Sequence, residues 1–192
     1  MNRVDVVWIG GYEFQADITQ RIQKCFHTAI NDHCKVFVVR LDIRFPKTYP
    51  HDGTNELVSE LFRQLKYQYY RKDIDCRYVW AREQHQSDVP HYHLLLLLDG
   101  SEIDGGLRVW SAATRIWKRR LDADSDAYVH LAGNGIMIRR PSPRSEDGKL
   151  IREIADFERD YRAAFNWAIY LAKTHTKGNA PHGVREWGSS RF

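Results

Sequence analysis

The sequence predicts an α+β fold in which helices flank a mainly antiparallel sheet of the ferredoxin-like, or RRM-like, kind. The prediction rests on two patterns. Apolar residues recur at helical spacing in four segments, and strand-like segments stand between them in the order helix, strand, helix, strand, strand, helix, strand, helix. A chain of 192 residues is long enough for one sizeable core, and no second core is evident. We therefore expect residues 1–192 to form a single domain.

Four segments have the apolar period of amphipathic helices. The first covers residues 13–31 and lies in an N-terminal extension, residues 1–35. Residues 54–72 and 107–121 carry apolar side chains every three or four positions. A long fourth helix is predicted over about residues 151–176, after a loop rich in Pro, Ser, Asp and Gly.

The strands are predicted between these helices. Residues 36–45 alternate between apolar and charged side chains, which is typical of a half-buried strand. Residues 76–85 and 91–99 are predicted to form a hairpin across a polar link. Residues 128–140 are strand-like around a Gly-Asn-Gly turn, and the basic tail, residues 177–192, is expected to run over the surface.

Composition excludes several classes of protein. The three cysteines have no C-x-x-C spacing, which argues against a disulfide framework or a zinc ribbon and favours a reducing compartment. The N-terminus is too interrupted for a secretory leader. The longest apolar run, Leu94 to Leu98, is far shorter than the roughly 20 residues of a membrane helix. We expect a protein of the cytoplasm with no membrane partner.

The net charge of +4 is unevenly distributed. Residues 1–100 carry 13 basic and 13 acidic side chains, whereas residues 101–192 carry 16 and 12. Arg outnumbers Lys by 12 to 4 in that second half. Because the guanidinium group suits bidentate contact with phosphate, this excess points toward nucleic acid, although basic halves also occur in proteins that bind nothing acidic.

A His pair begins the most apolar strand. His91 and His93 lie two residues apart, so in a strand both point to the same face and can bind one metal ion. Glu83 lies on the preceding strand and comes beside them if the hairpin register is favourable. Two imidazoles and a carboxylate leave coordination positions open on a divalent metal. The alternative is two partly exposed histidines after a turn, with Glu83 solvated beside Arg82.

Such a ligand set suits several chemistries. A cupin site would require a Glu soon after the His pair, whereas leucines follow here. The facial triad of non-haem iron oxygenases begins with H-x-D/E, and this chain has H-x-H. A hard metal that activates a phosphate fits better with the Arg-rich second half, so phosphoryl chemistry is favoured.

The last predicted helix supplies a possible nucleophile. Tyr170 is nine residues from Tyr161 and therefore faces away from the apolar stripe, alongside Asn166, Lys173 and Lys177. A Tyr with a Lys one turn later can act as a phenol nucleophile whose phenolate or phosphate is held by the ammonium group. Y-x-x-K is a weak motif, and by itself Tyr170 could be an ordinary half-buried tyrosine.

Taken in order, these motifs resemble the HUH single-strand DNA endonucleases, a group of rolling-circle initiators, relaxases and transposases. The closest likeness is to replication-initiator-like proteins of filamentous phages and prophages. The charged strand 36–46, Pro90-His-Tyr-His93 with Glu83, Tyr170-Leu-Ala-Lys173 and the ending 184–191 carry the resemblance over residues 36–192. Tyr92 replaces the usual aliphatic residue between the histidines. A single Tyr on the expected helix face implies the single-tyrosine type.

The resemblance implies an HUH endonuclease fold and a mechanism. Glu83, His91 and His93 would hold Mg²⁺ or Mn²⁺. Tyr170, assisted by Lys173, would attack the scissile phosphate and leave a 3′-OH and a 5′-phosphotyrosine. Trp187 would be a stacking platform within a track for single-stranded DNA, although each member could instead be a solvated surface side chain. The expected track is Arg40, Asp42, Arg44, Arg139, Arg140, Asn166, Lys177, Arg185 and Trp187.

The implied setting is a bacterial host cell and an origin or hairpin in single-stranded DNA. The sequence has no G-x-x-x-x-G-K-[ST], so unwinding would need a host or element helicase, with a polymerase for synthesis. Two alternatives stay open. One is a non-catalytic single-stranded nucleic-acid-binding module, and the other is a hydrolytic nuclease that uses water as the nucleophile.

Overall fold

The computed structural model describes residues 6–84, 89–123, 125–175 and 177–191. A separate hairpin consists of β1 (Val6–Ile9) and β2 (Tyr12–Gln15). The helices are α1 (Ala16–Asp32), α2 (Glu56–Tyr70), α3 (Gly106–Leu121) and α4 (Asp147–Ala168), with short 3₁₀ turns η1 (Asp126–Tyr128) and η2 (Ile169–Ala172). The main sheet contains β3 (Lys35–Ile43), β4 (Cys76–Glu83), β5 (His91–Asp99), β6 (Val129–Leu131), β7 (Ile136–Arg139) and β8 (Trp187–Ser189).

The main sheet is antiparallel throughout its paired strands. Its order is β6-β3-β5-β4-β8, and β7 pairs with the part of β3 that β6 leaves open. The sequence β3-α2-β4-β5-α3-β6 gives the split βαβ arrangement, in which β5 lies between two strands that a helix connects. The predicted α+β class with flanking helices is therefore confirmed.

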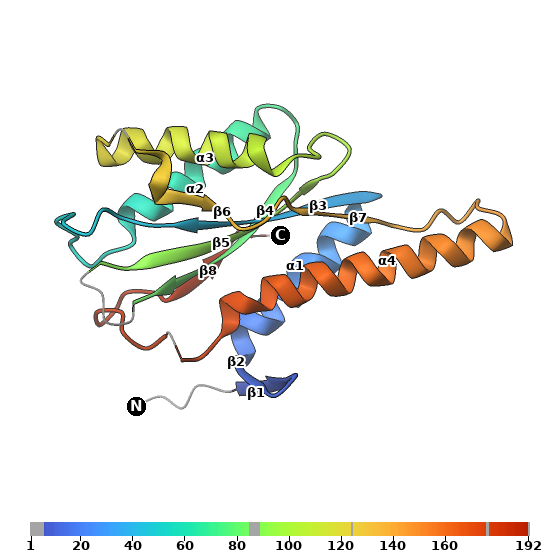
Figure 1. The fold of residues 1–192 in the computed structure, drawn as a ribbon, viewed down its shortest axis with the longest axis horizontal. Helices are drawn as coiled ribbons and strands as arrows, with labels where there is room; N and C mark the ends of the chain where they lie inside the picture. The colour runs from blue at the N-terminus through green and yellow to red at the C-terminus, as the bar shows by residue number, and fades with distance from the viewer. Residues whose placement is uncertain (1–5, 85–88, 124, 176, 192) are drawn as a thin grey trace.

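Helices cover both faces of this sheet (Figure 1). Strand alternation sends Phe37, Val39 and Leu41 toward α2 and α3, where one apolar core forms. Val38 and Leu95 point the other way, into a second core beneath α1, α4 and η2. The site described below lies at the margin of this second core, because its side chains continue the same strand faces.

The hairpin of β1 and β2 is absent from the sequence prediction. Residues from Glu13 onward were assigned to the first helix, but that helix begins at Ala16. Gly10 and Gly11 have φ of 58° and 81°, and this left-handed backbone makes the tight turn between the two strands. The basic tail also differs, since it adds β8 to the edge of β4.

Other boundaries agree closely with the prediction. The strand predicted over residues 76–85 ends at Glu83, and residues 85–88 of the hairpin link lie outside the described residues. The fourth helix begins and ends earlier than predicted, and its first turns extend beyond the sheet (Figure 1). In the described part of the chain, no helix has the length and apolar character needed to cross a membrane.

Gly135 permits β6 and β7 to share β3. Its φ is +88°, and a Cβ there would contact the Phe37 ring and lie 3.1 Å from the Val38 carbonyl oxygen. We expect Gly135→Val to lower the free energy of unfolding in urea by about 2 kcal/mol or more, because strain and overpacking add. The control Gly148→Ala meets no atom within 4 Å and lies in α4, so it should cost nothing. Equal effects would contradict this reading of the turn.

Candidate metal centre and nucleophile site

Strand register brings the acidic and imidazole side chains together. Glu83 on β4 pairs directly with His91 on β5, and His93 pairs with Asp42 on β3. Cross-strand partners project to the same face of an antiparallel sheet. The register that the sequence left open is therefore the favourable one, and Glu83 joins the two histidines.

Glu83, His91 and His93 form a group that could hold a metal ion. One ligand atom from each residue lies within 4.8 Å of the others. The Glu83 Oε2 atom is 3.3 Å from His91 Nε2 and 3.1 Å from His93 Nε2. Glu83 and His93 are buried, whereas His91 is half-exposed and opens the group to solvent.

The residues present fit a divalent cation. His93 Nδ1 is 2.6 Å from Asp42 Oδ1, so this nitrogen donates its proton to the carboxylate. Its Nε2 atom is buried and makes no hydrogen bond of good geometry, although it faces Glu83 Oε2. In neutral His93 this nitrogen is an acceptor that faces another acceptor, an arrangement that a cation between them would satisfy. Asp42 then has the place of the carboxylate that orients a metal-bound imidazole.

Electrostatics keep the two carboxylates ionised. Burial by itself would raise the pKa of Glu83, but the imidazoles of His91 and His93 beside its Oε2 atom and the charge of Lys177 hold it well below its usual range. Burial opposes the same outcome at Asp42, whose pKa is lowered by its contact with His93. Burial would lower the pKa of His93, yet the two carboxylates raise it. Protons and metal ions therefore compete for His93.

Lys177 is part of this buried group. Its Nζ atom lies 2.9 Å from Glu83 Oε1, and only 1% of its side chain is exposed. Lys177 is predicted as a DNA contact, but in this structure its ammonium group is enclosed beside Glu83. Asp42, another predicted DNA contact, is also buried, with its carboxylate behind His93.

Tyr170 lies directly against the metal group. Its ring meets the His93 ring edge-on, with centroids 5.3 Å apart. The Lys173 Nζ atom is 3.8 Å from the Tyr170 ring centroid, and the Arg40 guanidinium carbon is 4.8 Å from it. Arg40 also lies 5.5 Å from the Trp167 ring. The predicted nucleophile, its Lys and the predicted ligands are thus neighbours, although they come from distant parts of the chain.

The local backbone differs from the predicted continuous helix. α4 ends at Ala168, η2 carries Tyr170, and Lys173 is extended and forms a β-bridge with Phe14. The sequence has no Gly or Pro at the end of this helix. The chain leaves the helix where Lys173 pairs with Phe14 of the β1–β2 hairpin, which the sequence did not predict. Tyr161 nevertheless packs against Phe26, so the prediction that it faces the core is confirmed.

A protein-family model described as the YagK/YfjJ C-terminal domain matches residues 12–190. The chain belongs to this family. The matched region includes every residue of the metal group and the Tyr170 segment. No curated protein matches the chain, and no solved structure matches it either.

Four predicted DNA contacts of this YagK/YfjJ-family chain lie on the surface. Arg44 is exposed just after β3, and Asn166 is exposed near the end of α4. Arg185 is exposed on the tail, while its carbonyl oxygen accepts a hydrogen bond from Asn55. Trp187 is half-buried, and its Nε1 donates to Asp17 Oδ2, which restricts it as a stacking platform.

Arg139 and Arg140 lie away from the site. Arg139 pairs with Lys35, at the opposite end of β3 from Asp42, roughly 20 Å along the strand. Arg140 donates to the carbonyl oxygens of Ile30 and Asn31 near the end of α1. The structure therefore does not bring these two arginines together with Tyr170, and Arg140 binds backbone carbonyls at a helix terminus.

Sequence reasoning missed the position of Arg40. It was predicted on the DNA track, whereas the structure places it under the Tyr170 ring and 3.5 Å from Asp42. The alternation of β3 already put Arg40 and Asp42 on one face, so the signal was present. Only the register with β5 shows that this face belongs to the histidines.

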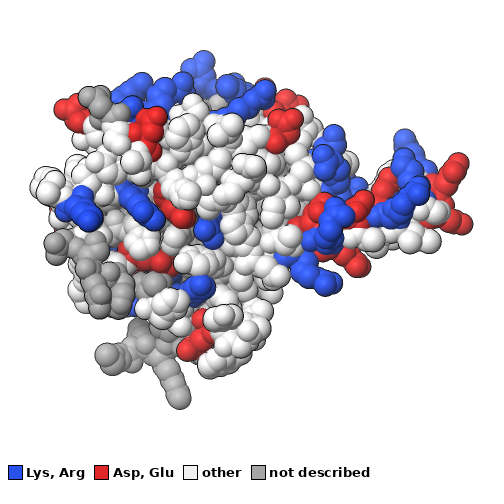
Figure 2. All heavy atoms as spheres, viewed as in Figure 1, with Lys and Arg blue, Asp and Glu red and all other residues white. Residues whose placement is uncertain are grey.

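The surface charge is spread widely (Figure 2). Lys and Arg side chains gather over α3, and both signs mix on the extending part of α4. The last turn of α3 alone carries Lys118, Arg119 and Arg120. The basic excess of the second half is therefore distributed over several surfaces, and part of it lies on the sheet face opposite the metal group.

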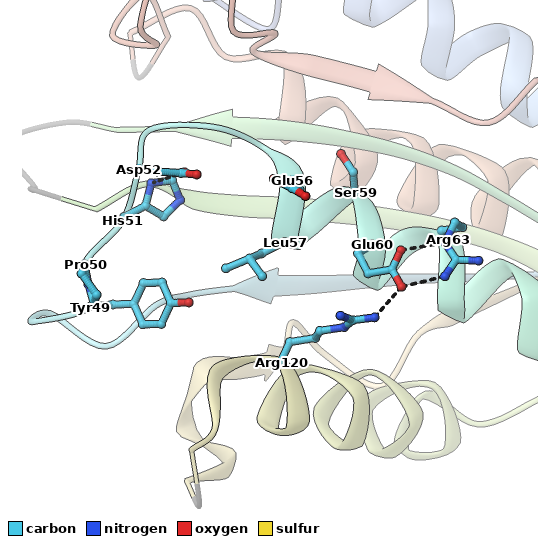
Figure 3. A pocket seen from close by; sticks show the side chains of 10 residues that line it. All are labelled: Tyr49, Pro50, His51, Asp52, Glu56, Leu57, Ser59, Glu60, Arg63 and Arg120. Atoms are coloured by element: carbon cyan, nitrogen blue, oxygen red, sulfur yellow. Dashed lines mark hydrogen bonds and ion pairs between the residues drawn. The ribbon is translucent and has the colours of Figure 1, made fainter.

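One of the largest hollows also lies on that opposite face, between α2, α3 and the loop of residues 49–52 that comes before α2 (Figure 3). Its volume is about 630 Å³. Within it the Glu60 carboxylate is paired with Arg63, 2.6 Å away, and with Arg120. Because one carboxylate already engages both guanidinium groups, the hollow is less suited to a phosphate than its arginines suggest.

Metal binding should depend on both carboxylates. We expect Mn²⁺ affinity, measured by electron paramagnetic resonance, to fall 10–100-fold in Asp42→Asn, because His93 loses its orienting partner. Glu83→Gln, which loses a ligand, should lose more. His33→Asn is the control, since His33 contacts Asp75 away from the group. Wild-type affinity in Asp42→Asn would refute the role given to Asp42.

Glu83 should also make stability depend on pH in the metal-free protein. Its folded-state pKa lies below the ordinary value of 4.5, so its contribution is present above about pH 4.5 and is lost as pH falls further. Urea unfolding of wild type and Glu83→Gln in EDTA should therefore differ at pH 7 and converge below pH 4.5. A constant difference would show that Glu83 does not titrate this way. Exposed Glu158→Gln provides the control.

Proposed function

We propose that this chain is a metal-dependent enzyme of the HUH type that nicks and joins single-stranded DNA through a 5′-phosphotyrosine. The proposal extends to initiation of rolling-circle-type replication for a phage or other mobile element. One observation carries it above the others. The Tyr170 ring contacts His93 of the metal group, although the two residues lie far apart in the sequence.

The protein's own groups suit the attack on a phosphate. Tyr170 is partly exposed, so a DNA strand can reach its hydroxyl. Lys173 and Arg40 lie on its ring, and their charges favour an anionic phosphate beside the tyrosine. Tyr161 is committed to the core, which supports a mechanism with one tyrosine.

The proposed reaction is a transesterification. Tyr170 Oη forms a bond to the scissile phosphorus while the bond from phosphorus to the 3′ oxygen breaks. The phenol proton is released, and the departing 3′ oxygen takes up a proton to become a free 3′-OH. Reversal by a second 3′-OH rejoins the strands without an external energy source. A bound Mg²⁺ or Mn²⁺ would polarise the phosphate and neutralise developing charge.

The setting follows from the same proposal. The substrate would be an origin or hairpin in single-stranded DNA, within the cytoplasm of a bacterial host. A helicase and a polymerase from the host or the element are proposed partners. Exposed Arg44 and Arg185 are proposed phosphate contacts.

A covalent adduct provides the test. We expect wild-type protein and Mn²⁺ to form a denaturation-resistant adduct with origin-like single strands, seen as a shifted band. Tyr170→Phe should abolish it, because the Tyr170 ring lies against His93 and its hydroxyl is the proposed nucleophile. The matched control Tyr161→Phe changes a core phenol and should keep the adduct.

The other outcomes separate the alternative functions. Cleavage without any adduct would indicate a hydrolytic nuclease with a water nucleophile. Salt-dependent binding that ignores EDTA and His91→Ala, without cleavage, would indicate a binding module. An adduct that persists in Tyr170→Phe would overturn the assignment of the nucleophile.

A further inference from the structure

Lys177 is a buried cation that the proposed reaction does not use. Its side chain is 1% exposed, and its Nζ atom lies 2.9 Å from Glu83 Oε1. A buried lysine is costly unless it is paired, so this contact is a specific feature of the fold. Its partner, Glu83, is a member of the metal group, so the ion pair can affect metal binding as well as stability.

The two oxygens of Glu83 have different neighbours. Oε1 contacts Lys177, whereas Oε2 faces both histidine Nε2 atoms at 3.1–3.3 Å. A cation between the histidines therefore meets Oε2, and Oε1 could join it only if the ammonium group moved away. Lys177 thus leaves Oε2 as the Glu83 oxygen available to coordinate a metal ion.

Lys177 also belongs to the segment that carries Tyr170. It follows Tyr170 by seven residues, since 177 − 170 = 7. Lys173 fastens the intervening backbone through its β-bridge with Phe14, and the Thr174 hydroxyl donates to the Glu13 carbonyl oxygen. The Lys177 N–H in turn donates to the Thr174 carbonyl oxygen. Glu83 therefore contacts both the histidines of the metal group and Lys177, which ends the segment from Tyr170 to Lys177 (the Tyr170 segment).

We propose that Lys177 is a positioning residue that couples metal occupancy to the placement of the Tyr170 segment through Glu83. This inference rests on the metal centre of the proposed function and gives Lys177 a role that neither the family match nor the motif pattern assigns to it. Lys177 and the metal ion compete for the charge of one carboxylate. Each therefore weakens the hold of the other, and such coupling is reciprocal.

The coupling has a definite sign. Removal of the ammonium group leaves Glu83 with its full charge for a metal ion, so affinity should rise. In the wild type, a bound divalent cation draws on Glu83 and should loosen the contact with Lys177. The backbone around Lys177 should therefore exchange its amide protons faster when metal is bound.

The first test measures Mn²⁺ affinity by electron paramagnetic resonance. We expect Lys177→Met, which keeps the length of the side chain, to bind Mn²⁺ at least 10-fold more tightly than wild type. Lys177→Arg restores the charge and should return the affinity toward wild type. Lys173→Met is the matched control, because Lys173 lies on the same segment but contacts the Tyr170 ring. Its affinity should change less than threefold.

The second test follows the segment itself. Amide exchange at Lys177 and Gly178, whose N–H groups donate to Thr174 and Glu186, is measured with and without Mn²⁺. Exchange should accelerate with metal in wild type and show no metal dependence in Lys177→Met. A merely structural lysine would alter exchange equally under both conditions.

Failure of the inference can be distinguished from failure of the proposed function. If wild type binds no Mn²⁺ at millimolar concentration, the metal centre fails, and the proposed function fails with it. If wild type binds Mn²⁺ and Lys177→Met binds it equally well or more weakly, only the coupling is overturned. Where Lys177→Met is unstable without metal, the rise in thermal midpoint on adding Mn²⁺ is compared instead. The inference requires a larger rise than in wild type, and an equal or smaller one overturns it.

Discussion

The antiparallel register of β5 against its two neighbours is the constraint on which the site depends. Pairing with β4 places His91 opposite Glu83, and pairing with β3 places His93 opposite Asp42. A slip of one residue would turn these side chains to the other face and send Tyr92 into their place. Leu94 to Leu98 supply both cores alike, so the two faces of β5 are distinguished at its start, where Tyr92 packs in the core beneath α2 and α3 and the histidines face the other side.

The same register creates an unusual density of buried charge. Asp42 and Glu83 lie on either side of His93, with Arg40 and Lys177 beside the two carboxylates. Ionised groups lose much of their hydration when buried, so each must find an opposite charge. The two apolar cores supply the favourable free energy that makes such a cluster tolerable. The fold tolerates this buried charge because apolar cores cover both faces of the sheet.

Much of this arrangement could be predicted from local sequence patterns. The helices, β3, the β4–β5 hairpin and the His pair all follow from periodicity. Tyr170 is exposed as the spacing predicts, although it lies in η2 and not in a continuous helix. The contacts of Lys177 with Glu83, of Arg40 with Tyr170 and of Asp42 with His93 could not be predicted, because they join segments far apart in the chain. The end of α4 was also inaccessible, since Lys173 leaves the helix to pair with Phe14, and no local signal marks that competition.

The short strand β8 has a consequence for how copies of this molecule meet. It pairs with Val79, Trp80 and Ala81 and so occupies the outer edge of β4, where Gly188 lets its backbone lie close to the Trp80 ring. An uncovered β4 would present a ladder of free N–H and C=O groups with high strand propensity, which is the usual template for edge-to-edge aggregation. Residues 187–189 therefore cover the edge of β4, and their deletion would expose backbone groups that can pair with a strand of another copy.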